Sequence, residues 1–276
     1  MIDYWNDDQP VSTVVRRAVP AAQLLSPPHA SLSILLRPSV EPTPLIKLVT
    51  PDSNSASGPD NFLVNQTGSV FLSSPFVLWA SEPAGGRYVA SFSTVFRINL
   101  YRTNATSKGE GLAFVVASSN GGGGSLPPGS HGGYLGLTNA SMDSNPANGF
   151  AAVELDTVKQ PYDLDDNHVG LDVNGVRSTH ATSLTPFDIQ LAPIDTTVND
   201  GFYMVWVNYD GASRRARAYV AKNGTRHGVA LLDAPLDLSA VLLGKRAYFD
   251  FSASTSVKYQ FNCVPTWNMT VERLPG

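Results

Sequence analysis

The stretch Ser91-Phe-Ser-Thr-Val-Phe-Arg-Ile-Asn-Leu100 decides the fold class. Its apolar and β-branched residues fall on the even positions, and polar residues fill most of the odd ones. A period of two residues is typical of a β-strand with one face buried and the other wet. The members of the buried face are Phe92, Thr94, Phe96, Ile98 and Leu100.

The same signal recurs along the chain from about Phe62. Clusters of Gly, Asn, Asp and Ser separate the periodic runs, and no run has the 3.6-residue period of an amphipathic helix. Many short strands with turn signals between them predict an all-β, antiparallel two-sheet jelly-roll sandwich. The further strands are expected at residues 112–116, 152–156, 168–173, 202–209, 216–220, 248–251 and 267–271.

The first part of the chain differs from the rest. Pro and Ser are frequent there, and Leu36-Arg-Pro-Ser-Val-Glu-Pro-Thr-Pro44 is incompatible with a central strand or a helix. We therefore predict an irregular N-terminal extension over residues 1–58, whose only candidate strand lies within Ala30–Leu36. The β-sandwich domain is expected over residues 59–273, with residues 274–276 as a tail.

Composition narrows the classes of function. The 276 residues carry a formal net charge of −4 and only 15% charged residues. A nucleic-acid-binding surface would need a basic stripe, and the sequence contains none. No apolar run approaches the ~20 residues of a membrane span.

The signals for cellular compartment conflict. Cys263 is the only cysteine, so no disulfide can form within the chain, which favours a reducing compartment. Against this, five N-x-[ST] sequons favour a secreted glycoprotein. The acidic start of the chain lacks the features of a signal peptide, so either the chain is not secreted or its own N-terminus is missing. The sequons begin at Asn65, Asn104, Asn139, Asn223 and Asn268.

One segment concentrates carboxylates around an imidazole. Glu154 and Asp156 lie on one face of a predicted strand, and His168 opens the next strand on its polar face. The acidic loop between the strands carries Asp163 and Asp165, with Asp166 beside them. Carboxylates gathered with one imidazole suit a hard cation beside a borderline transition metal. A solvated acidic loop is the alternative, because Asp also favours turns.

Several motifs, in order along residues 59–273, resemble those of the legume lectin domain. The closest resemblance is to the lectin ectodomains of plant lectin receptor-like kinases; no kinase segment follows in this chain. The motifs are Val89-Ala-Ser-Phe-Ser-Thr-Val-Phe96, Gly111-Leu-Ala-Phe-Val115, Gly132-Gly-Tyr-Leu-Gly-Leu137, Glu154-Leu-Asp-Thr157 with Asn167-His-Val-Gly-Leu-Asp-Val-Asn174, Val205-Trp-Val-Asn-Tyr-Asp210 and Phe251-Ser-Ala-Ser-Thr255.

The resemblance implies a concanavalin-like sandwich that binds carbohydrate and performs no catalysis. It also implies a site for calcium and manganese, or a similar divalent metal. In that site Glu154 and His168 would ligate the transition metal and Asp156 would bridge both ions. Asp163 fits the second bridging carboxylate when positions are counted back from His168, and Asp165 fits when they are counted from Asp156. The two counts differ because the loop is two residues shorter than the family pattern.

The residues that would bind sugar depart from the family pattern. Glu110 stands where sugar-binding members have Asp, and Gln160 stands where they have the Asn that binds calcium and sugar. Gly132 and Gly133 keep the loop whose backbone N–H donates to a sugar hydroxyl, although a tight turn with positive φ would need the same glycines. We therefore expect a partly eroded sugar site. Weakened or lost metal binding stays open as an alternative.

The implied partner is a glycan or a glycoprotein, with an extracellular or secreted location and homodimerisation as further expectations. One alternative is a recognition module for a peptide or a small apolar ligand on a lectin scaffold. A glycoside hydrolase is the weaker alternative. Glu154 and Asp156 share a face, but Val158 and Lys159 occupy the positions where one laminarinase-like family carries a further Glu.

Overall fold

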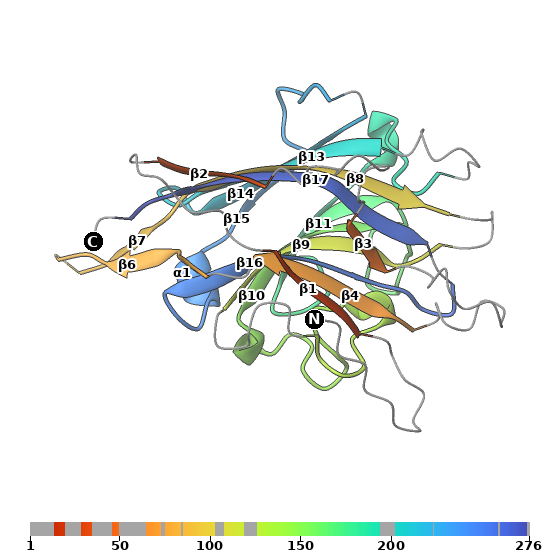
Figure 1. Cartoon of the computed structure of the whole chain (residues 1–276), viewed down its shortest axis with the longest axis horizontal. Coiled ribbons are helices and arrows are strands. Elements are labelled where there is room, and N and C mark those ends of the chain that lie inside the picture. Colours follow the sequence, from red (N-terminus) through yellow and green to blue (C-terminus); the bar gives the residue numbers. More distant parts are fainter. Residues whose placement is uncertain are drawn as a thin grey trace.

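Two β-sheets stacked face to face make up the molecule (Figure 1). The computed structural model describes residues 14–19, 29–34, 46–49, 65–72, 75–83, 85–102, 108–118, 126–193, 202–222, 224–258 and 260–274. The single α-helix in this described part is α1 (Leu238–Val241), and short 3-10 turns lie at Gly132–Tyr134, Pro146–Asn148 and Thr185–Phe187. The predicted all-β jelly-roll sandwich is therefore confirmed. None of the described helices is long and apolar enough to cross a membrane.

The first sheet carries the acidic segment. Its neighbouring strands pair antiparallel, except β1 and β4, which pair parallel. A short strand, β5 (Phe76–Val77), also pairs with β16. In spatial order the sheet runs β1 (Val14–Val19), β4 (Thr67–Leu72), β16 (Arg246–Ser254), β9 (Gly111–Ser118), β10 (Phe150–Asp156), β11 (His168–Val173) and β12 (His180–Ser183).

The second sheet covers the back of the first and is antiparallel throughout. Its spatial order is β15 (Leu232–Pro235), β14 (Arg215–Ala221), β13 (Phe202–Asp210), β8 (Phe92–Tyr101), β17 (Phe261–Glu272) and β2 (His29–Ile34), with β3 (Ile46–Val49) also pairing with β17. A separate hairpin joins β6 (Trp79–Ser81) and β7 (Arg87–Val89).

Aromatic side chains from both sheets form the centre of the core. Phe96 on β8, whose alternation predicted the fold, is 1% exposed and meets Phe251 of the facing sheet edge-on at 4.8 Å between ring centroids. Trp267 also lies 4.8 Å from Phe251, and its indole N–H donates to the Thr94 hydroxyl at 2.9 Å. Such pairs contribute about 0.5–1.5 kcal/mol each beyond their apolar burial, so the contacts of Phe251 with Phe96 and Trp267 stabilise the packing of the two sheets.

The first part of the chain contributes three strands, where the sequence indicated one. β2 coincides with the candidate strand within Ala30–Leu36, whereas β1 and β3 were not predicted. Runs this short carry too little periodicity to be recognised among Pro and Ser. The division of the chain at residue 58 stays a prediction. Cys263 is buried in β17, and the sequons at Asn104 and Asn223 lie outside the described residues.

Candidate metal centre and neighbouring loops

The register between β10 and β11 brings the polar groups of the acidic segment together. Asp156 lies opposite His168, and Glu154 lies opposite Gly170. Residues opposite each other in an antiparallel pair point to the same face of the sheet. The alternation that places apolar residues inward on both strands therefore turns all these polar side chains outward on one patch.

Three side chains meet at this patch. The ligand atoms of Glu154, Asp156 and His168 all lie within 4.8 Å of one another, and all three residues are buried. His168 Nε2 is 3.2 Å from Glu154 Oε1. The convergence that the sequence predicts is thus present, while metal binding by these groups stays a prediction.

The imidazole of His168 is held from behind. Its Nδ1 lies 3.0 Å from the backbone oxygen of Asp165 and 3.4 Å from the Asp165 carboxylate. A proton on Nδ1 satisfies this carbonyl. Nε2 faces Glu154, to which it donates when protonated, and it offers a lone pair to a metal when deprotonated. Asp165 therefore contacts the far side of the ring from the cluster.

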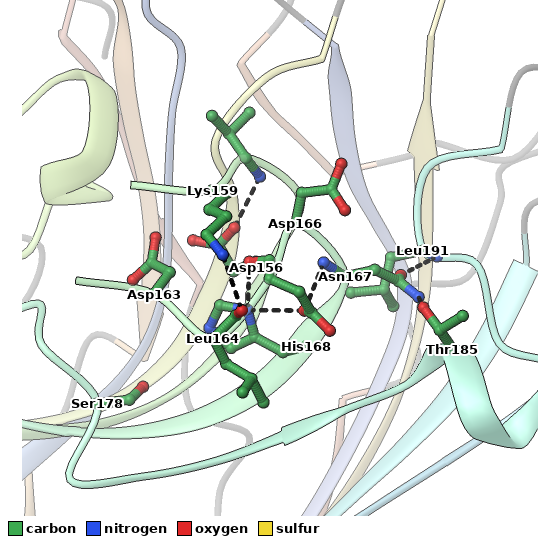
Figure 2. Close-up of polar contacts among 12 residues, drawn as sticks. Asp156, Lys159, Asp163, Leu164, Asp166, Asn167, His168, Ser178, Thr185 and Leu191 are labelled. Carbon is green, nitrogen blue, oxygen red and sulfur yellow. Dashed lines mark hydrogen bonds and ion pairs between the residues drawn. The ribbon is translucent and has the colours of Figure 1, made fainter. Parts of the chain in front are cut away.

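Asp163 lies on the cluster side. Its Oδ2 accepts a hydrogen bond of 2.6 Å from the Gln160 backbone N–H, and its charge helps to raise the pKa of Asp156. Burial raises the pKa of Asp163 itself, with Glu154 adding to the effect. Neither Asp163 nor Asp165 belongs to the group of three whose ligand atoms lie within 4.8 Å of one another, so the choice between the two counts stays a prediction. Asp166 instead forms an ion pair with Lys108, and Figure 2 shows it on the other side of Asp156 from Asp163.

Two residues of the cluster were not predicted from the sequence. Asp172 is fully buried on β11, and the Ser178 hydroxyl contacts both its Oδ1, at 2.9 Å, and Glu154 Oε1. Gly170 makes room for them, because a Cβ there would overlap Ser178 Oγ and Glu154 Oε1. The alternation from His168 through Gly170 to Asp172 was the available signal for the aspartate. Nothing local marked Ser178, which reaches the cluster from the following loop.

The cluster is electrostatically poised for a cation. Burial raises the pKa of Asp156 well above its usual range, and the charge of Glu154 raises it further. Burial and Glu154 act in the same way on the pKa of Asp172, whose Oδ2 has no hydrogen-bond partner among the described residues. For His168, burial is the largest single influence and lowers the pKa, but the hydrogen bond to Glu154, the charges of Glu154 and Asp163 and the contact with the Asp165 backbone together raise the pKa. Two carboxylates and an imidazole are a donor set that fits a divalent transition metal.

Side-chain hydrogen bonds fix the far end of the acidic loop. The Asn167 amide donates to the Ile189 carbonyl at 2.7 Å and to the Thr185 hydroxyl at 3.1 Å. Its oxygen accepts from the Leu191 N–H at 3.0 Å, and Figure 2 shows the links to Thr185 and Leu191. This anchor sets the position at which β11 begins, and with it the position of His168.

The residues expected to bind sugar gather around one amide. The Gln160 Nε2 donates to Glu110 Oε2 at 2.9 Å, and Glu110 is only 2% exposed. A Cβ built on Gly133 would lie 2.9 Å from the Gln160 side chain, so Gly133 permits this packing. The Tyr162 hydroxyl donates to the Gly133 carbonyl at 3.3 Å.

Gly132 has a structural role in this arrangement. Its φ is +64°, which favours glycine, and its N–H donates to the Thr255 carbonyl at 3.0 Å. The Ser254 hydroxyl donates to the Gly132 carbonyl at 2.5 Å. The structure therefore has the positive-φ turn that was one of the two explanations for this glycine pair.

Comparisons with known proteins fit this geometry. The family model described as "Legume lectin domain" matches residues 27–275. The chain is 34% identical over 233 residues to a probable L-type lectin-domain containing receptor kinase S.5 of Arabidopsis thaliana, covering 83% of this chain and 32% of that protein. It is 33% identical over 212 residues to the receptor kinase SIT1 of Oryza sativa subsp. japonica, covering 74% and 31%. The chain thus spans about a third of these relatives.

Solved structures give the same result. A peanut lectin with a 9mer peptide aligns with a TM-score of 0.64 and 26% identity, covering 84% of this chain and 87% of that one. Basic winged bean lectin with Tn-antigen aligns with a TM-score of 0.63 and 25% identity, covering 84% and 88%. The similarity extends over most of this chain and over nearly the whole of both lectins.

Proposed function

The chain belongs to the legume lectin domain family, and from that premise we propose that it is a non-catalytic carbohydrate-binding module supported by calcium and a manganese-like ion. One observation carries the proposal: two buried carboxylates and a buried imidazole have ligand atoms within 4.8 Å of one another on the face of the sheet. A buried cluster of raised-pKa carboxylates is costly unless a cation or protons neutralise it.

Each residue of the cluster has a distinct part in this proposal. Glu154 and His168 Nε2 would ligate the transition metal, and Asp156 would bridge to calcium together with Asp163. Asp165 would hold the His168 ring from behind, as an outer hydrogen-bond partner of a ligating histidine does. When bound, the ions supply fixed positive charge that holds the acidic loop in place.

Sugar recognition would fall to the neighbouring loops. The Glu110 carboxylate would accept hydrogen bonds from sugar hydroxyls, with the Gln160 amide and the backbone of Gly132 and Gly133 beside it. The extra methylene of Glu110 displaces its carboxylate by about one C–C bond, ~1.5 Å. Charge-assisted hydrogen bonds tolerate only a few tenths of an ångström. We therefore expect weak monosaccharide binding and preference for larger glycans.

The location follows from the relatives. Receptor kinases carry their recognition domains outside the cell, so we propose that this domain is extracellular and meets a glycan or a glycoprotein there. Homodimerisation remains a prediction.

A glycan array with and without EDTA tests the proposal, paired with calorimetric titration of Ca²⁺ and Mn²⁺. We expect glycan binding that EDTA abolishes and that added metal restores. Asp156→Asn should weaken metal binding at least about a hundredfold, because it removes the bridging ligand. The matched control is Asp188→Asn, at an exposed position with φ of +57° that Asn tolerates.

Two results would contradict the proposal. One is metal affinity that Asp156→Asn leaves unchanged. The other is EDTA-insensitive binding of a peptide without any glycan binding. Peptide recognition is the second candidate function, because the peanut lectin structure contains a 9mer peptide. Release of reducing sugar from a β-glucan would instead indicate a hydrolase.

A further inference from the structure

A cavity of about 380 Å³ opens beside the acidic loop. This volume falls within the range of about 300–1,000 Å³ typical of small-ligand sites. Its charged and hydroxyl-bearing lining residues are Arg102, Lys108, Lys159, Asp166, Ser256 and Lys258.

The cavity is strongly cationic in a chain that is acidic overall. Four cationic side chains face one carboxylate in its wall, while the whole chain has a formal net charge of −4. Lys108 pairs with the single acid, Asp166. The exposed Lys258 forms no ion pair with any described residue, and Lys159 donates one of its three N–H groups to the Leu164 carbonyl at 3.1 Å. A concave wall lined by one sign of charge concentrates ligands of the opposite sign.

The cationic cavity adjoins the saccharide loops at two of its lining residues, Lys159 and Ser256. Lys159 directly precedes Gln160, whose amide holds Glu110. Ser256 lies beside the glycine turn, because a Cβ built on Gly132 would be 3.8 Å from the Ser256 Cβ. A ligand that reaches Glu110 and Gln160 with its hydroxyls can therefore place an anionic group among the lysines.

We propose that the saccharide taken by this site is acidic, with uronic-acid carboxylates facing Lys159 and Lys258 while its hydroxyls face Glu110 and Gln160. This inference rests on the proposed carbohydrate-binding function. Hydroxyls match the acceptors of the saccharide loops, and carboxylates match the ammonium groups of the cavity. A neutral saccharide would offer no carboxylate to Lys159 and Lys258, since the one acid of the wall, Asp166, pairs with Lys108.

Calorimetry with three probes tests the inference in the presence of Ca²⁺ and Mn²⁺. The probes are trigalacturonate, the neutral galactotriose of the same length, and inorganic phosphate. We expect trigalacturonate to bind at least about tenfold more tightly than galactotriose at low salt, with the advantage shrinking as ionic strength rises. Lys258→Glu should weaken trigalacturonate binding by roughly five- to tenfold and leave galactotriose unchanged. Lys222→Glu is the matched control, since Lys222 is exposed and lies outside the cavity.

The other outcomes separate this inference from the function on which it rests. Equal binding of the two trisaccharides, unaffected by Lys258→Glu, overturns the acidic ligand and leaves the lectin function standing. Phosphate binding as tight as trigalacturonate overturns the saccharide class, because the cavity then takes any anion. Binding of no saccharide by this method or on the glycan array overturns the proposed function itself.

Discussion

Gly170 decides how closely β11 approaches the carboxylates of β10. A methyl group at this position would overlap Ser178 Oγ and Glu154 Oε1, both of which are ends of flexible side chains. The side chains would shift and the strand would stay. We expect Gly170→Ala to lower transition-metal affinity by about tenfold or more, with little change in the melting temperature of the metal-free protein. Metal titration and thermal melts in EDTA measure the two effects.

The control for this prediction is Gly228→Ala, because a Cβ on Gly228 would meet nothing within 4 Å. That variant should bind metal as the unmodified chain does. Unchanged metal affinity in Gly170→Ala would mean that metal binding does not depend on the Glu154 carboxylate in its place beside Gly170.

The two departures from the family's sugar residues also act at single positions. Glu110→Asp together with Gln160→Asn should restore the shorter carboxylate and the shorter amide. Each correctly placed hydrogen bond to a charged group contributes about 1.5–3 kcal/mol, so monosaccharide binding should rise by roughly tenfold or more. Titration with monosaccharides, with and without EDTA, measures the gain. Tight, EDTA-sensitive monosaccharide binding by the unmodified chain would show that the site is not eroded.

At the scale of elements, the hairpin of β10 and β11 couples metal binding to pH. Burial raises the pKa of Asp156 and Asp172, so these groups ionise at higher pH in the fold than in the unfolded chain, where Asp titrates near about 3.9. Their ionisation therefore opposes folding as pH rises through the raised values. His168 acts in the same direction: its stabilising effect is present below its unfolded pKa of about 6.5 and is lost as pH rises through the folded value.

We therefore expect the metal-free protein to melt at a higher temperature near about pH 5 than near about pH 8. Added Ca²⁺ and Mn²⁺ should reduce or invert this difference in melting temperature, because metals bind the deprotonated ligands. Melts in EDTA and in metal at both pH values provide the measurement. Asp172→Asn removes one titrating group and should flatten the pH dependence in EDTA. A metal-free protein that melts lower at the acidic pH would contradict the electrostatic description.

The elements themselves were predictable where periodicity was long. The alternation in β8 predicted a half-buried strand, and its apolar face lies in the core. The polar faces of β10 and β11 likewise predicted that Glu154, Asp156 and His168 would converge. The face of each residue was a local signal, because strand geometry determines it. The convergence also required β10 and β11 to pair with Asp156 opposite His168.

The loop between those strands could not be predicted in the same way. Counting back from His168 gives Asp163 and counting from Asp156 gives Asp165, and the sequence does not show the path of the loop between them. In the structure Asp163 accepts from the Gln160 N–H, whereas Asp165 contacts the His168 ring. Ser178 joined the cluster from a loop, and Gln160 turned to Glu110, which lies 50 positions away in sequence. Such contacts depend on tertiary packing, which single-sequence patterns do not encode.

At the scale of the whole molecule, three strands from the first part of the chain pair with the two sheets. β2 pairs with β17 from Ile34 opposite Trp267 to His29 opposite Glu272. A chain that begins at residue 27 keeps this ladder, whereas one that begins at residue 59 loses it. We expect the shorter chain to be less stable by at least about 3 kcal/mol, or roughly 6–12 °C in melting temperature, from the lost hydrogen bonds alone.

Thermal melts of the two truncated chains, in metal and in EDTA, measure this difference. The chain from residue 27 serves as the control, since the family match also starts there. Equal melting temperatures would instead support the boundary at residues 58 and 59 that the sequence suggests.

Under the proposed function, the hydrogen bond between Gln160 and Glu110 makes the Gln160 amide a competitor of sugar hydroxyls for the Glu110 carboxylate. A sugar hydroxyl gains access only in the fraction of molecules in which the amide has swung away. If this bond contributes about 1.5–3 kcal/mol, that fraction is roughly 0.6–7%, and the apparent dissociation constant rises by the inverse factor. A ligand that offers several hydroxyls together can displace the amide where a single sugar ring cannot. Under the same proposal, we expect this internal bond to favour ligands that offer several hydroxyls over single sugar rings.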